Sequence, residues 1–102
     1  MKIIEKLSGM IEDEISDAEK YARCALNNKT EHPKLADLFY RLSQEEMNHM
    51  SLLHEAVTEM IADYRREHGD PPKDMLAVYN YLHQKQIDRA IDVKGIQGMY
   101  KQ

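Results

Sequence analysis

The sequence predicts an all-α protein, a long antiparallel helical hairpin followed by a C-terminal helix. Only four glycines and three prolines occur in 102 residues, and they fall in a few places. Such sparse helix breakers are typical of long helices rather than of many short strands. Apolar residues also recur at intervals of three and four, which is the period of an amphipathic helix. A chain of 102 residues is long enough for one domain, and we expect residues 1–102 to form a single one.

The first helix is expected from about residue 2 to residue 28. One acidic residue, Glu14, interrupts its apolar stripe. The sequence Asn27-Asn28-Lys29-Thr30 then breaks the pattern with residues that favour caps and turns. The stripe contains Ile3, Ile4, Leu7, Met10, Ile11, Ala18, Tyr21, Ala22 and Ala25.

The second helix is expected from about residue 33 to residue 68. Pro33 suits the first turn of a helix, where its missing N–H is not needed. Gly69-Asp70-Pro71-Pro72 ends this helix. About 35 residues at 1.5 Å per residue make a rod of roughly 50 Å, which needs packing partners along its whole length. Glu46 and His49 interrupt a stripe made of Leu35, Leu38, Phe39, Leu42, Leu53, Ala56, Val57, Met60 and Tyr64.

A C-terminal helical segment is expected from about residue 73 to residue 100. Its apolar phase drifts near Asp92, and Gly95 and Gly98 weaken the helix end, which indicates a kink or two shorter helices. His83 follows Tyr79 on the stripe and would reach a site on the hairpin only if this segment folds back onto it. Core packing or a role in an interface explains His83 better.

Composition excludes several classes of function. The net charge is −4 and no block of lysine and arginine occurs, so we expect no nucleic-acid partner. No apolar run approaches the roughly 18–20 residues that cross a bilayer, and the N-terminus lacks the apolar region of a secretory signal. The single cysteine, Cys24, excludes an intrachain disulfide and a CxxC metal site. We therefore expect a cytoplasmic protein without a membrane partner.

Three polar residues replace apolar ones in the two hairpin stripes. Glu46 and His49 are three residues apart and share one helix face. Glu14 lies about 16 residues before the expected turn and Glu46 about as far after it, so the two should stand at the same height. A buried carboxylate needs compensation, and a metal ion supplies it in many helical bundles. The hypothesis is a metal site formed by Glu14, Glu46 and His49.

The alternative is that the acids pair with lysine or arginine, or that water enters the bundle at this level. Buried ion groups of that kind often add little stability. A single Glu-x-x-His spacing is also a weak signal, because it arises easily by chance in a chain rich in glutamate. Glu45 points about 100° away from Glu46 and is interpreted as a surface acid, as is Asp17.

The three residues are half of a known arrangement. Two-metal sites in helical bundles take a Glu from each of two helices and a Glu-x-x-His from each of two others. This chain has one copy of each part, and residues 73–102 contain no glutamate. Either the site holds one ion, or two chains meet around a two-fold axis and complete a four-helix bundle. We favour the homodimer or a larger homo-oligomer.

The spacing resembles the rubrerythrin branch of the ferritin-like superfamily over roughly residues 11–56. Glu14 is followed after six residues by Tyr21, and Phe39 stands seven residues before the Glu46-x-x-His49 motif. The resemblance implies that Glu14, Glu46 and His49 are iron ligands and the catalytic residues of a di-iron centre. It also implies that Glu46 bridges the metals, that Tyr21 lies near the iron, and that the activity is of the ferroxidase type, oxidising Fe²⁺.

The single-hairpin plan is more similar to encapsulated ferritins, which complete their site across a dimer interface. An encapsulin-type shell is then a partner to consider, although the final GIQGMYKQ is not a clear docking tail. Peroxide reduction with a separate electron donor, as in rubrerythrins, is one alternative function. A non-catalytic helical assembly module is another. Mn²⁺ and Zn²⁺ accept similar ligands, so the sequence leaves the metal open.

Overall fold

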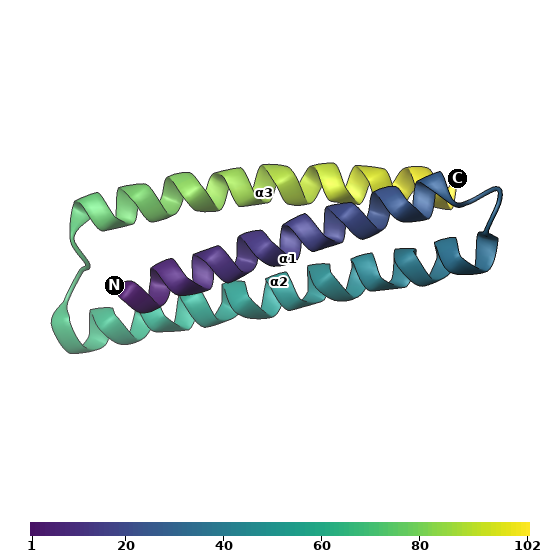
Figure 1. Ribbon diagram of the computed structural model, residues 1–102. Coiled ribbons are helices and arrows are strands. Elements are labelled where there is room, and N and C mark those ends of the chain that lie inside the picture. Colours follow the sequence, from purple (N-terminus) through teal and green to yellow (C-terminus); the bar gives the residue numbers. More distant parts are fainter.

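The computed structural model describes all 102 residues and contains three helices and no strand (Figure 1). The helices are α1 (Lys2–Asn27), α2 (Pro33–His68) and α3 (Lys73–Lys101). The all-α prediction is confirmed. The molecule is a rod with extents of 56 × 18 × 18 Å, as long as its longest helix requires.

Helix α1 lies between the other two helices (Figure 1). Helix α2 runs antiparallel to α1, and α3 runs parallel to α1. The parallel order is fixed at both ends: the N-terminal ammonium group of Met1 lies 3.0 Å from the sulfur of Met75, and the Lys29 ammonium donates to the carbonyl of Gln102 at 2.5 Å. Helices α2 and α3 touch at few points, so a groove runs between them.

The two connections are built from residues that stop helices. At the first, the side-chain amide of Asn28 donates to the Cys24 carbonyl at 2.8 Å, and Pro33 then opens α2 in its first turn. At the second, Gly69 adopts φ +80°, a conformation that side chains rarely tolerate, and its N–H caps the Arg65 carbonyl. Pro71 and Pro72 follow and keep α2 from continuing.

Helix α3 is one continuous helix, so the predicted kink or division near Asp92 is wrong. Each glycine weakens a helix by about 1 kcal/mol relative to alanine, which is the reason for that expectation. Val93 and Ile96, on either side of Gly95, are buried, and Tyr100 stacks on Tyr40 of α2 at 5.0 Å. Packing of these side chains offsets the weakness of the two glycines.

The core is a single seam that α1 forms with its two neighbours. Isoleucines fill the first half of the α1 stripe, and the fully buried Ala18, Ala22 and Ala25 fill the second half, where α2 approaches. Only 15 of 102 residues are buried, and several large apolar side chains remain exposed on α2 and α3. None of the three helices combines the length and the apolar character that crossing a membrane requires.

One polar group joins all three helices inside this seam. The hydroxyl of Ser43 on α2 is fully buried, donates to the Ala18 carbonyl of α1 at 2.7 Å, and accepts from the Gln97 amide of α3 at 2.8 Å. A buried hydroxyl with both roles satisfied fixes the relative height of the helices that it joins.

Replacing Ser43 by alanine is expected to lower the free energy of unfolding by about 1–2 kcal/mol, because the Gln97 amide loses its acceptor inside the structure. Urea unfolding measures the loss. Ser51→Ala is the matched control: that exposed hydroxyl bonds only to the Met47 carbonyl of its own helix, so a change within about 0.5 kcal/mol is expected. Equal effects of the two substitutions would contradict the role given to Ser43.

Candidate metal centre

Glu14, Glu46 and His49 converge near the middle of the hairpin. Glu14 comes from α1, and Glu46 and His49 come from successive turns of α2. One ligand atom from each residue lies within 4.8 Å of the other two. The predicted meeting of these three side chains is confirmed, whereas metal binding by them stays a prediction.

The helix register explains why they meet. The four small buried positions Ala18, Ala22, Ala25 and Ala36 let the two backbones approach closely along the half of the hairpin nearest the turn. The bond from Ser43 to the Ala18 carbonyl then fixes the register one turn away from the cluster. Glu14 lies four residues before Ala18 in α1, and Glu46 lies three residues after Ser43 in α2. Because the two helices are antiparallel, both carboxylates stand about one turn from the Ser43–Ala18 hydrogen bond in the same direction and reach the same height.

Histidine is the only basic group near the two carboxylates. The Nδ1 atom of His49 lies 3.5 Å from Oε2 of Glu14 and 3.8 Å from Oε2 of Glu46. No lysine or arginine lies within ion-pair distance of either carboxylate, so the alternative of a structural ion pair with such a residue is not observed. The imidazole alone faces two acids.

Oε2 of Glu14 is buried and accepts no hydrogen bond, although the Glu14 side chain as a whole is 26% exposed. The short distance to Nδ1 of His49 is therefore a close contact without hydrogen-bond geometry. An unsatisfied buried acceptor destabilises a fold by about 1–3 kcal/mol, more when it is charged. A cation held between Glu14, Glu46 and His49 would satisfy this oxygen, so the donor set fits a metal.

The cluster lies at an open surface of the hairpin, with Glu46 19% and His49 52% exposed at their side chains. Five exposed apolar side chains, each 37–44% exposed, stand at helical spacing from it. Four are eleven residues, or three turns, from a cluster residue, and one is a single turn away. The five apolar residues are Ile3, Met10, Leu35, Leu38 and Met60. Together with the cluster they form a surface that we call the α1/α2 face.

Tyr21 and Phe39 form the next layer towards the hairpin turn. Each stands seven residues, about two turns, from a carboxylate of the cluster, and their rings stack with centroids 6.2 Å apart. The pair closes the α1/α2 seam on that side. Glu45 and Asp17 are exposed and take no part in the cluster, as their helix positions predicted.

His83 does not reach the cluster. It packs against His54 of α2, ring on ring, in the groove between α2 and α3. His54 lies five residues after His49, so the two rings do not share a face of α2 and the helix pattern does not assign His54 to the cluster. No local pattern could have paired it with His83, since that contact depends on how α3 docks. Cys24 is half-buried and unpaired.

Comparison with protein-family models, with curated proteins and with solved structures found no match to this chain.

Proposed function

We propose that this chain is a ferritin-like di-iron carboxylate protein that oxidises Fe²⁺ at a site shared between two copies. The observation that carries the proposal is the Glu14–Glu46–His49 cluster with its unsatisfied buried oxygen. Glutamate oxygens are hard ligands that suit iron, and histidine adds a nitrogen ligand to each metal. The spacing of the motif, with Tyr21 and Phe39 two turns from the carboxylates, agrees with this class of protein.

A second copy supplies what one chain lacks. Three protein ligands are half of a two-metal set, and a two-fold axis through the cluster would bring four glutamates and two histidines together. The α1/α2 face presents exposed apolar side chains around the cluster, which is typical of an interface between subunits. Helices α1 and α2 of both copies would then form a four-helix bundle, with α3 on its outside.

In the shared site each residue has a separate task. Glu14, Glu46 and His49 of each copy would hold the ions, with Glu46 as the ligand that both ions share and with Glu14 and His49 each as a ligand to a single ion. The His49 ring must be neutral to bind, so metal binding releases any proton that it carries between the two acids. In the dimer the apolar side chains of the α1/α2 face would be buried between the two copies on both sides of the site along the helices. The chemistry that bound iron supplies is the transfer of one electron per Fe²⁺ to O2 or to peroxide.

The direct test is to load the metal-free protein with Fe²⁺ under anaerobic conditions and then admit air. Oxidation faster than in buffer alone, followed by its absorbance, is the expected result. Stopped-flow comparison of O2 with H2O2 separates an oxidase from a peroxide reductase, since the latter would react much faster with H2O2. A protein that oxidises iron no faster than buffer with either oxidant would contradict the proposal.

Metal binding is also expected to stabilise the fold. At a free Mn²⁺ concentration a hundred times the dissociation constant, one site adds about 2.7 kcal/mol to the free energy of unfolding. Thermal unfolding with and without Mn²⁺ measures this without any redox chemistry. Glu14→Ala should abolish the shift, and Asp17→Ala, one turn away and exposed, should keep it. Equal melting temperatures with and without metal would favour a non-catalytic assembly module.

A further inference from the structure

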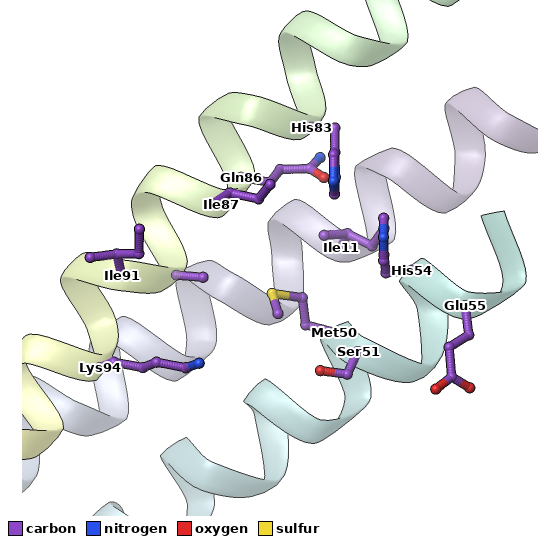
Figure 2. A pocket seen from close by; sticks show the side chains of 11 residues that line it. Ile11, Met50, Ser51, His54, Glu55, His83, Gln86, Ile87, Ile91 and Lys94 are labelled. Carbon is purple, nitrogen blue, oxygen red and sulfur yellow. The ribbon is translucent and has the colours of Figure 1, made fainter. Parts of the chain in front are cut away.

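A groove lined by residues of α2 and α3 separates these two helices. Its larger hollow has a volume of about 440 Å³, with Ile11 of α1 at its base (Figure 2). The walls are mostly apolar, and α2 and α3 approach each other there through few side chains. What holds the two helices together along the groove is therefore a small number of contacts.

Figure 2 shows His54 of α2 and His83 of α3 meeting at one end of this hollow. Their rings are parallel within 2° and their centroids are 4.3 Å apart. Tyr79 stacks on His83 at 5.8 Å, and both histidines also line a second hollow towards the Gly69 turn. The histidine pair thus crosses the groove and divides it.

The side-chain hydrogen bonds and the other ring contact that join α2 to α3 lie towards the opposite end of the two helices. Tyr40 stacks on Tyr100, and Gln97 donates to Ser43, both near the C-terminus of α3. At the other end of the groove, the connection at residues 69–72 joins the two helices. In the half of the groove nearest that connection, the stacked histidines are the one ring-on-ring contact from helix to helix.

Few charged groups lie around the two rings, and none forms an ion pair with either one. Besides the two histidines, four charged or titratable residues line the two hollows: Glu55 and Arg65 of α2, and Lys94 and Tyr79 of α3. Helix α1 contributes no charged group to the lining, only Ile11. No carboxylate lies within ion-pair distance of either ring. Burial, and then the charge of His54, lowers the pKa of His83 below its ordinary value of 6.5. Burial also raises the pKa of Tyr79, which keeps that ring uncharged.

We propose that the His54–His83 stack is a pH-sensitive contact that holds α3 against α2 when the rings are neutral. Protonation of both rings places two like charges face to face and separates the helices, which joins the two hollows into one open groove. The sign follows from linkage: a histidine with a lowered pKa in the fold contributes stability that is present above pH 6.5. That stability is lost as the pH falls through the value that His83 has in the folded protein.

The test is the melting temperature of the full chain as a function of pH, from about pH 8 to pH 5, with a chelator present so that His49 binds no metal. Amide hydrogen exchange at both pH values locates any opening. His83→Phe keeps an aromatic ring in the stack and cannot titrate, and His83→Gln removes both ring and charge. His32→Gln is the control, because His32 is exposed and has no ring partner.

The wild type and His32→Gln are expected to lose melting temperature together as the pH falls, with faster exchange in the part of α3 around His83. His83→Phe should fold as well as the wild type at pH 8 and lose most of that pH-dependent decrease. His54→Gln should do the same from the other helix. An equal pH dependence in the wild type and His83→Phe, or faster exchange in α1 rather than α3 at low pH, would overturn the proposal.

Discussion

Replacing Glu46 by alanine is expected to slow Fe²⁺ oxidation by at least about a hundredfold. Mutation of a residue that only supports a metal ligand lowers metal affinity or activity by about 10- to 100-fold. Loss of the ligand itself should lower the rate by at least the upper end of that range. Glu46 is the least exposed of the three cluster residues and lies at the same height as Glu14 across the hairpin. In the proposed site it contacts both metals, so its loss affects both. Stopped-flow oxidation after anaerobic loading measures the rate.

Glu45→Ala is the matched control for that substitution. Glu45 is the adjacent residue, carries the same charge, is exposed, and points away from the cluster. Its removal should leave the rate within about twofold of the wild type, because screening by solvent weakens such a charge. If Glu46→Ala oxidised iron as fast as Glu45→Ala, the cluster would not be the site of oxidation.

Placing an arginine at Leu38 is expected to separate the two copies and abolish oxidation together. Leu38 stands three turns from His49 on the α1/α2 face and is 41% exposed in the single chain. In the proposed dimer the arginine would be buried without a partner, which costs roughly 3–5 kcal/mol of binding free energy. The dimer dissociation constant should therefore rise by at least about a hundredfold. Light scattering gives the mass, and the oxidation assay gives the activity of the same sample.

Val78→Arg is the control for this surface. Val78 is more exposed than Leu38 but lies on α3, which is outside the proposed interface. This variant should stay dimeric and active. A Leu38→Arg protein that remained dimeric and fully active would contradict the placement of the interface. One that became monomeric yet oxidised iron normally would instead contradict the shared site.

The hairpin and its cluster follow from local sequence features. Pro33 and Gly69 bound α2 by their own backbone chemistry, and Asn28 caps the end of α1. With the turn placed, the equal distances of Glu14 and Glu46 from it determine that they face each other. The apolar period determines on which side they lie, since a helix has only one stripe to bury.

The position of α3 could not be derived in the same way. Its apolar residues point to several sides: Val93 and Ile96 are buried, whereas Val78 and Ile91 are among the most exposed large apolar side chains of the molecule. No single stripe therefore identifies its partner. Burial around Gly95 outweighs the low helix propensity of glycine, which made the expected kink wrong. The His54–His83 contact depends on that docking and has no signature in either helix alone.

Metal content, measured on the same sample as the solution mass, shows whether two copies share one two-metal site. We expect about one metal ion per chain in a species of two chains or a multiple of two, and loss of the metal when Leu38→Arg separates the copies. A monomer that holds its metal as tightly as the assembled protein, or an assembled protein that binds none, would contradict the shared site.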